Sequence, residues 1–467
     1  MSHYIRWLTI LGVLVITLHA SAQVSFAPPA TYNVVGNNAV AFTVADVNGD
    51  GKIDLIGGTV GDGDYSNGTV SILTNNGAGG FTLASTMNPG GGPSTITAAD
   101  INGDGMMDLI TANFNNGNGN TLSVLTNGGD GTLGIKAMLI AGTAPTSVIT
   151  ADINGDGKLA LICANLVLFP PPGFTNFTLS VFTNDGSGGF GSNATINVPD
   201  DCRTVVAADI NGDHKLDLIC GGATNCLTVL TNDGKGGFGF KARLTAGPDT
   251  YFGYRKQYLV MARDINGDHK PDLLSISYSD STLTILTNNG SGDFGSNTTL
   301  NVGGFPGSAA IADINGDGRP DLICAYDSPP SVNVLTNNGN GGFVLAATLG
   351  AFYLPRCVTV ADVNGDGRPD VIEQDLGNHT VSVYANSTIF PPPASTPNPT
   401  LKHSGQVTSV SWPSASAGWL LQQSHDLTLA HWGPAGFNGF NISDDGTNNT
   451  LTIPPQPGNG FFRLIHP

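Results

Sequence analysis

A nine-residue motif recurs seven times in this chain of 467 residues, and successive copies begin 49 to 57 residues apart. It reads DVNGDGKID from Asp46 and DINGDGRPD from Asp313, with oxygen-bearing side chains at the first, third, fifth and ninth positions. Alternate residues of a tight turn can point to one centre, and calcium takes roughly six to eight oxygen ligands at about 2.3–2.6 Å. Glycines at the fourth and sixth positions let the backbone turn that sharply. The motif therefore predicts a series of calcium-binding loops.

The predicted ligands are the side-chain oxygens at these four positions and the backbone carbonyl at the seventh position. In chain order they are Asp46, Asn48, Asp50, Lys52 and Asp54; Asp100, Asn102, Asp104, Met106 and Asp108; Asp152, Asn154 and Asp156; Asp209, Asn211, Asp213, Lys215 and Asp217; Asp264, Asn266, Asp268, Lys270 and Asp272; Asp313, Asn315, Asp317, Arg319 and Asp321; and Asp362, Asn364, Asp366, Arg368 and Asp370. They predict up to seven calcium ions.

Three copies of the motif depart from the pattern. The third ends in Ala160 and so has one carboxylate fewer, and we expect its site to be weak or empty. The fourth and fifth carry His214 and His269 in place of a glycine. Histidine adopts positive φ more readily than most residues, so we expect both loops to bind calcium still. A transition metal is disfavoured there, because no second His or Cys lies at ligand spacing.

The segments between the motifs read as short strands, because apolar and small residues alternate between clusters of Gly and Asn. In the second unit the expected strands are residues 94–100, 108–113, 121–127 and 135–141. The segment SILTNNGAGGF from Ser71 also recurs with small changes in later units. A repeat of this length is typical of a propeller or an array.

These units resemble FG-GAP or VCBS repeats, which build the calcium-binding propeller of integrin alpha chains and occur in many secreted bacterial proteins. The resemblance covers about residues 24–388 and implies an all-β fold, a seven-bladed β-propeller of four-stranded blades. The seventh unit stops after its third strand, at HTVSVYANS. Phe26 occupies the place that Phe81 has in the first unit, so we expect the N-terminal segment to complete the last blade.

The chain divides into four parts. Arg6 precedes an apolar run that ends in the small residues ASA, so residues 1–22 are expected to be a secretory signal peptide, too short to span a membrane. Residues 23–388 form the propeller, the Pro-rich residues 389–400 a linker, and residues 401–467 a small β-rich module for sorting, attachment or glycan contact, or a passive cap. We expect a secreted or cell-surface protein in a calcium-rich medium.

The net charge of −18 comes from Asp, since all but one of the acidic residues are Asp and twenty of them lie in the motifs. This acidity argues against nucleic acid as a partner. Six cysteines suit an oxidising compartment. Two interpretations stay open: matched disulfides Cys163–Cys202 and Cys324–Cys357 with Cys220 and Cys226 left over, or buried free thiols throughout.

The chain has no GxSxG, HExxH or P-loop sequence, which favours a binding protein over an enzyme. In an antiparallel blade the calcium loops share one face, and the irregular links between strands share the other. An aromatic insertion belongs to that second face, with candidate ligand residues Tyr251, Phe252, Tyr254, Arg255 and Tyr258. We predict a secreted module that binds a protein or glycan, with a role in cell adhesion. The alternatives are a polysaccharide lyase or glycosidase acting at that face, or a structural sorting module.

Overall fold

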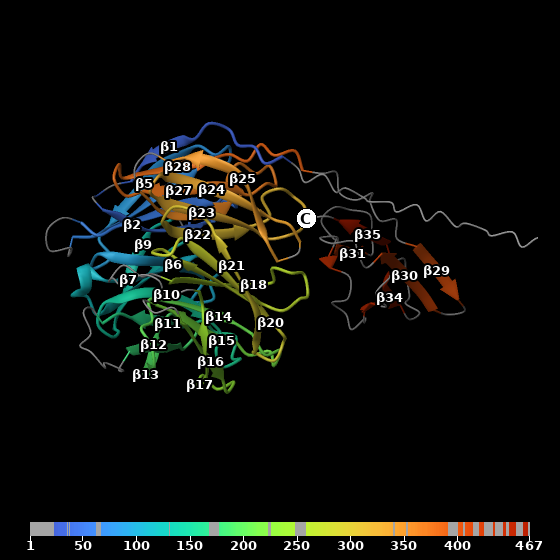
Figure 1. Cartoon of the computed structure of the whole chain (residues 1–467), viewed down its shortest axis with the longest axis horizontal. Helices are drawn as coiled ribbons and strands as arrows, with labels where there is room; N and C mark the ends of the chain where they lie inside the picture. The colour runs from blue at the N-terminus through green and yellow to red at the C-terminus, as the bar shows by residue number, and fades with distance from the viewer. Residues whose placement is uncertain are drawn as a thin grey trace, which may run out of the picture.

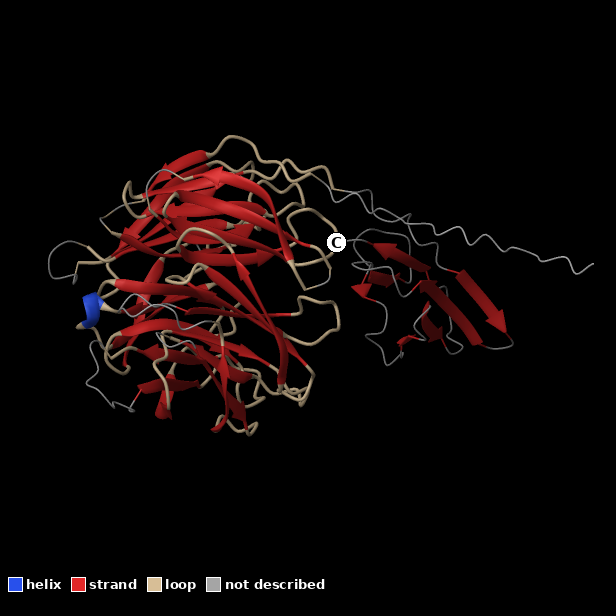
Figure 2. Ribbon diagram, viewed as in Figure 1, coloured by secondary structure: helices blue, strands red, loops and turns tan. Residues whose placement is uncertain are grey.

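The computed structural model describes residues 23–390, apart from residues 35, 37, 62–66, 130, 168–176, 223–225, 248–257, 340 and 352–353, together with strands between residues 400 and 465. Seven four-stranded antiparallel sheets follow one another around a ring in the first of these regions (Figure 1). The only helical segment among the described residues is one 3-10 turn, η1 (Asn115–Gly117) (Figure 2). The predicted all-β, seven-bladed propeller is confirmed.

Each blade contains a first, second, third and fourth strand, and each pairs with the next. The first strands are β2 (Ala39–Ala45), β6 (Pro93–Ala99), β10 (Pro145–Ala151), β14 (Thr204–Ala208), β18 (Tyr258–Arg263), β22 (Pro306–Ala312) and β26 (Pro355–Ala361). The second strands are β3 (Asp54–Thr59), β7 (Asp108–Asn113), β11 (Ala160–Asn165), β15 (Asp217–Gly221), β19 (Asp272–Ser277), β23 (Asp321–Asp327) and β27 (Asp370–Asp375). The third strands are β4 (Thr69–Asn75), β8 (Thr121–Asn127), β12 (Phe177–Asn184), β16 (Cys226–Asn232), β20 (Thr282–Asn288), β24 (Pro330–Asn337) and β28 (Thr380–Tyr384). The fourth strands are β5 (Phe81–Met87), β9 (Leu133–Ile140), β13 (Phe190–Val198), β17 (Phe238–Thr245), β21 (Phe294–Asn301), β25 (Phe343–Gly350) and, for the seventh blade, β1 (Ala30–Asn33).

The N-terminal segment closes the ring, as the sequence predicted. Strand β1 pairs with β28, with Ala30 opposite Val383 and Asn33 opposite Thr380. Phe26 forms a bridge with Asn386, which repeats the pairing of Phe81 with Asn75 in the first blade. Because both ends of the propeller lie in one sheet, the seventh blade has no unpaired third strand.

The core lies between the blades. Second strands such as β7 are buried along their whole length, because a neighbouring blade covers each face, and this explains why consecutive residues such as Leu109 and Ile110 are both apolar. Leu55 and Leu73 of the first blade pack with Ile372, Val381 and Val383 of the seventh, and similar clusters fill the other interfaces. The interfaces between blades therefore make the ring one packed unit.

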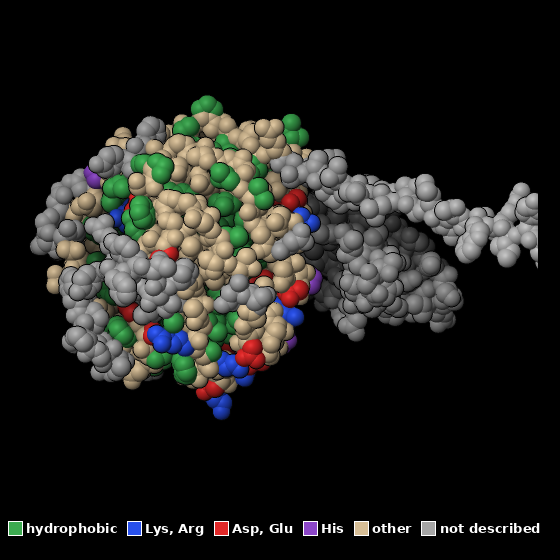
Figure 3. All heavy atoms as spheres, in the orientation of Figure 1, with side chains coloured by type: hydrophobic (Ala, Val, Ile, Leu, Met, Phe, Trp, Pro, Cys, Tyr) green, Lys and Arg blue, Asp and Glu red, His purple; other side chains and the backbone are tan. Residues whose placement is uncertain are grey.

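The fourth strands face solvent and carry several exposed apolar side chains, such as Ile140, Phe240 and Val344. Charged side chains are sparse on the face shown in Figure 3, where uncharged and scattered hydrophobic groups make up most of the visible propeller surface. Isolated apolar side chains of this kind are common on soluble proteins.

Beyond the propeller the described segments are strands in two sheets. One contains β29 (Thr400–Ser404), β30 (Val407–Pro413), β34 (Asn448–Ile453) and β33 (Ile442–Asp444), and the other contains β32 (Gly433–Pro434), β31 (Leu420–Ser424) and β35 (Phe461–Ile465). Residues 1–22 and 391–399, which include the predicted signal peptide and most of the predicted linker, lie outside the described residues. Within the described part of the chain, no helix is long and apolar enough to cross a membrane.

Candidate calcium loops

Each motif forms the loop between the first and second strands of a blade, and its first aspartate holds the loop together. The Oδ1 atom of Asp46 accepts hydrogen bonds from the backbone N–H groups of Gly49 (2.8 Å) and Asp50 (3.2 Å), and Oδ2 accepts from Gly51 (2.7 Å). The bonds from the fourth and sixth residues recur in all seven loops. All seven loops therefore share one arrangement of hydrogen bonds around the first aspartate, which we call the loop frame.

The sixth residue of each loop adopts a left-handed backbone conformation. Gly51 has a φ of 81°, and His214 and His269 have φ values of 63° and 65°. Both histidines donate their backbone N–H to the first aspartate at 2.8 Å, as the glycines do. The expectation that histidine keeps this loop conformation is confirmed.

In five of the seven loops the fifth-position carboxylate contacts a cation from its own loop. Asp50 Oδ1 accepts the backbone N–H of Lys52 at 3.0 Å, and Asp50 Oδ2 lies 3.4 Å from Lys52 Nζ. Equivalent ion pairs join Lys215 to Asp213, Lys270 to Asp268, Arg319 to Asp317 and Arg368 to Asp366. Sequence reasoning considered only the backbone carbonyl of these residues and missed the side-chain pairing, although a Lys or Arg at this position in six of the seven motifs was the available signal.

The ninth-position aspartate is buried and joins the loop to the third strand. In the first blade Asp54 Oδ2 accepts the backbone N–H of Val47 (3.1 Å), and Oδ1 accepts that of Asn75 (2.9 Å). The same two bonds occur for Asp108, Asp217, Asp272, Asp321 and Asp370. Burial, with a smaller contribution from nearby carboxylates, raises the pKa of all six, to about 7 for Asp321 and about 6 for Asp370.

An asparagine at the end of each third strand links neighbouring blades. Asn75 Nδ2 donates to Ile53 O of its own blade and to Val363 O in the loop of the seventh blade, both at 2.8 Å. The bond to the preceding loop recurs for Asn127, Asn184, Asn232, Asn288, Asn337 and Asn386. Seven such bonds connect every loop to the next blade. Sequence reasoning gave these asparagines no role, although the dipeptide TN recurs in the third strands of six units.

The donor set fits an oxygen-preferring divalent cation. Among the described residues, no three His, Cys, Asp or Glu side chains converge as they would around a metal ion. The carboxylates accept backbone N–H groups instead, and an oxygen that accepts a single hydrogen bond, such as Asp46 Oδ2, keeps a second lone pair. The loops therefore present the oxygen chemistry that calcium selects, and occupancy of the predicted ligands stays a prediction.

The third loop keeps the frame but lacks the buried carboxylate. Asp152 accepts the N–H groups of Gly155 (2.7 Å) and Gly157 (2.9 Å), as in the other loops. Ala160 occupies the ninth position, so no carboxylate joins Ile153 to Asn184. Lys158 Nζ donates to the backbone carbonyl of Asp185 (2.7 Å).

The sixth loop is covered by the segment that leaves the propeller. The ring of Phe390 lies against Gly316, so closely that a methyl group added at Gly316 would collide with it. Asn315 is buried, whereas the third-position asparagine of the other loops is half-buried or exposed. The glycine turns of other blades approach the preceding loop in the same way, as Gly188 approaches Asn102. Since β1 completes the seventh blade, no glycine turn follows its third strand, and Phe390 takes that place.

The structure contains no disulfide, and neither pairing suggested by the repeats brings its two sulfurs together. Cys163 packs between the second and third blades, whereas Cys202 packs between the third and fourth. Cys324 packs between the fifth and sixth blades, whereas Cys357 Sγ lies 3.3 Å from the carbonyl of Val40 in the first. Cys163 and Cys202 therefore lie on opposite faces of the third blade, and the sixth and seventh blades separate Cys324 from Cys357.

The second face contains the links that the sequence identified as irregular. Tyr251, Phe252, Tyr254 and Arg255 lie outside the described residues, and Tyr258 is the first residue of β18, opposite Ser277.

Sequence reasoning missed an aromatic pair in two of the links on this second face. The rings of Tyr278 and Phe305 have centroids 5.5 Å apart, and the Tyr278 hydroxyl donates to Asp327 Oδ2 at 2.9 Å. Phe305 is 42% exposed. The aromatic residues in the links SYSDS and GGFPG were the signal available for this pair.

Comparison with known protein families gives one family. The FG-GAP-like repeat matches residues 46–111, 166–220, 212–275, 264–324 and 313–373, which together span more than half of the chain. The chain belongs to the FG-GAP-like repeat family. This family has a β-propeller fold that typically serves binding rather than catalysis. A search of curated protein sequences finds no relative of this FG-GAP protein.

Several solved structures resemble the FG-GAP propeller. BBS1N in complex with ARL6DN, soaked with lead, is 12% identical with a TM-score of 0.53, covering 78% of this chain and 97% of that chain. A protein from Lactobacillus plantarum is 14% identical with a TM-score of 0.52, covering 70% and 89%. A lectin from Agrocybe aegerita that recognises non-reducing terminal N-acetylglucosamine is 20% identical with a TM-score of 0.47, covering 74% and 85%. At these identities the first two likenesses show the fold alone.

Proposed function

We propose that the chain is an exported, calcium-stabilised propeller that binds a protein or glycan partner on the face opposite its metal loops. The observation that carries the metal part is the frame of hydrogen bonds around the first aspartate, which recurs in all seven loops, six of them with the full acidic donor set. A family fold that typically serves binding supports the second part.

The residues that would hold each ion are those of the loop. The carboxylates at the first, fifth and ninth positions, the asparagine oxygen between them and the seventh carbonyl are oxygen donors. Bound calcium would supply positive charge among side chains that otherwise repel one another. Because each loop is bonded to the next blade through an asparagine, order in one loop supports its neighbour.

The proposed partner surface is the second face. Its links differ in length and sequence from blade to blade, while the blades themselves are uniform, and variable loops on a rigid scaffold commonly carry recognition. The exposed Phe305 ring and the Tyr278 hydroxyl lie in two of these links. Aromatic rings with polar neighbours suit sugar and protein surfaces.

Calcium counting tests the metal part. Native mass spectrometry of the chain without residues 1–22 is expected to show six tightly bound calcium ions, with a seventh only at high calcium because of Ala160. Thermal unfolding should shift upward with calcium, because each ion that binds only the folded state adds about 2.7 kcal/mol at 100 times its Kd. A protein that binds no calcium and unfolds at an unchanged temperature contradicts this part of the proposal.

A binding screen tests the partner part. Arrays of glycans and extracellular proteins should retain the calcium-loaded chain, and Phe305→Ala should weaken that retention while Phe240→Ala, on the outer strand β17, leaves it unchanged. If both variants lose retention equally, the partner binds at a surface that does not include Phe305. Release of new reducing ends from a polysaccharide panel would favour the alternative of a lyase or glycosidase.

A further inference from the structure

Two thiols meet at one end of the fourth blade. Val205 in β14 lies opposite Cys220 in β15, just as Val148 lies opposite Cys163 in the third blade. Cys202 lies three residues before Val205, as Pro145 lies three residues before Val148. Cys202 therefore has the position in the fourth blade that Pro145, the first residue of β10, has in the third. In the fourth blade the first strand begins only at Thr204, so the backbone ladder is shorter there.

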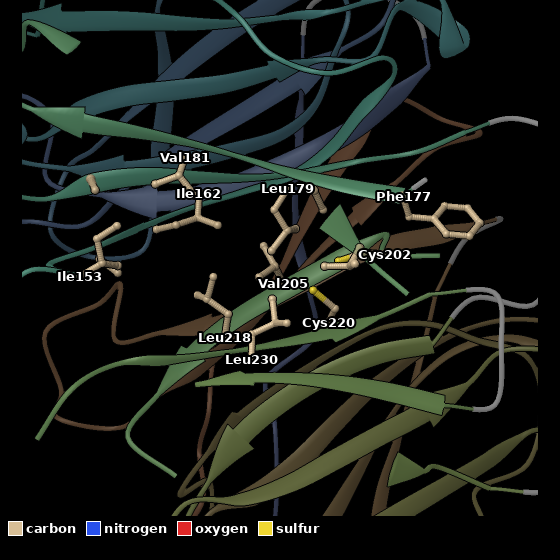
Figure 4. Packing of buried hydrophobic residues seen from close by; sticks show 14 residues of the cluster. Ile153, Ile162, Phe177, Leu179, Val181, Cys202, Val205, Leu218, Cys220 and Leu230 are labelled. Atoms are coloured by element: carbon tan, nitrogen blue, oxygen red, sulfur yellow. The ribbon is translucent and has the colours of Figure 1, made fainter. Parts of the chain in front are cut away.

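The local contacts bring the two sulfurs together. Both side chains are buried in the cluster between the third and fourth blades, with exposed fractions of 0% for Cys202 and 2% for Cys220. Figure 4 shows the two side chains next to each other beside Val205, within one buried cluster. The N–H of Arg203 donates to Gly221 O at 2.8 Å, which holds the Cys202 segment against the end of β15.

We propose that Cys202 and Cys220 form a disulfide within the fourth blade. The two S–H bonds are replaced by one S–S bond, and the two protons and two electrons pass to a small-molecule disulfide such as oxidised glutathione, which leaves as two thiols. The bond closes a loop that contains β14 and the fourth metal motif, from Asp209 to Asp217.

Burial determines when the bond forms. The pKa of Cys202 is raised well above its ordinary value by burial and by the neighbouring thiol, so little thiolate exists once the blades have packed. The exchange therefore belongs to folding in an oxidising medium, before the third blade covers both sulfurs.

Peptide mapping tests the pairing. The chain is refolded with calcium in a buffer of reduced and oxidised glutathione, and the folded fraction is alkylated in denaturant at acidic pH. It is then digested without reduction, using a protease that cleaves before Asp, because cleavage at Asp200 and Asp201 separates Cys163 from Cys202. We expect a linked pair of peptides containing Cys202 and Cys220, and a melting temperature a few degrees above that of the reduced protein.

Matched variants decide between neighbouring sulfurs. Cys226→Ser is expected to keep the linked peptides, and Cys220→Ser is expected to lose them. A folded protein in which both Cys202 and Cys220 are alkylated overturns the proposal, as does a Cys163–Cys202 or Cys220–Cys226 link. If Cys220→Ser does not fold, fragment-ion sequencing of the linked peptides from the unsubstituted chain still identifies the bonded residues.

Discussion

The third and sixth loops are built on the same frame but differ in what surrounds it. In both, the first aspartate accepts backbone N–H groups from the fourth and sixth residues at 2.7–2.9 Å. The third loop lacks the ninth carboxylate and is open to solvent, whereas the sixth has Asp321, fully buried, and is covered by Phe390.

This difference shows that two parts of the motif have different structural roles. The first aspartate and the glycine turn set the shape of the loop, since that shape survives in the third blade without a ninth carboxylate. The ninth aspartate joins the loop to the third strand, where the asparagine of that strand reaches the preceding blade. A motif residue that sequence reasoning treated as a metal ligand is thus also a structural contact between elements.

Loss of the buried carboxylate from the sixth loop is expected to have the largest effect. Asp321→Ala removes the acceptor of two buried N–H groups, those of Ile314 and Asn337, and should cost about 3–5 kcal/mol of unfolding free energy. Denaturant unfolding measures the loss, and native mass spectrometry should show one calcium ion fewer. An unchanged free energy of unfolding would show that the sixth loop needs its carboxylate no more than the third.

The pH dependence of the metal-free protein is the next largest effect. Burial raises the folded-state pKa of Asp321 to about 7, of Asp370 to about 6 and of Glu373 to about 8, all above their unfolded values. These groups favour folding most below their unfolded pKa, near 4, and that stability is lost as the pH rises through about 6 to 8.

Calcium-stripped protein should therefore melt at a higher temperature at pH 5 than at pH 8. Saturating calcium binds the ionised carboxylates and should reduce or reverse this trend. Thermal unfolding at both pH values, with and without calcium, measures both parts. A stripped protein that becomes more stable toward pH 8 would contradict the assignment of buried neutral carboxyl groups.

Restoration of the ninth carboxylate in the third loop should increase the free energy of unfolding, by less than Asp321→Ala lowers it. Ala160→Asp adds a carboxylate where Ile153 and Asn184 supply the N–H groups used in the other six blades, and the loop frame is already present. We expect one further bound ion and about 1–2 kcal/mol of added stability at calcium roughly 10–30 times the Kd of the restored site. A variant that loses stability with calcium present would show that the third blade has repacked around alanine.

The contrast between these loops shows which features sequence could predict. The place of Phe26, the turn at His214 and the missing ligand at Ala160 depend on local pattern. The structure agrees with the first two, and the weak third site stays a prediction. The bond from Asn75 to Val363 joins residues 288 positions apart, so no local pattern specifies its partner.

The cysteines show the same limit. Repeat positions identified which strands carry them, but whether sulfurs meet depends on the face to which each side chain points and on the shortened first strand of the fourth blade. A shift of one residue in a strand reverses that face. Strands and loops were therefore predictable, and contacts between blades were not.

Removal of the Phe390 ring that covers the sixth loop should have the smallest effect on stability. It tests whether shielding from water alone changes how a loop holds calcium. Phe390→Ala removes the ring over Gly316 and leaves every oxygen donor of the loop in place, so the ion count should not change. Calcium should leave the sixth loop faster, because water reaches Asn315 and Asp317, and the stability should fall by about 1 kcal/mol or less, given that the ring is only partly buried. Stopped-flow release into a chelator should then lose its slowest phase, whereas Ile389→Ala, at an 85% exposed neighbour, should retain it. If the slowest phase persists in Phe390→Ala, the sixth loop differs from the third only through its ninth carboxylate.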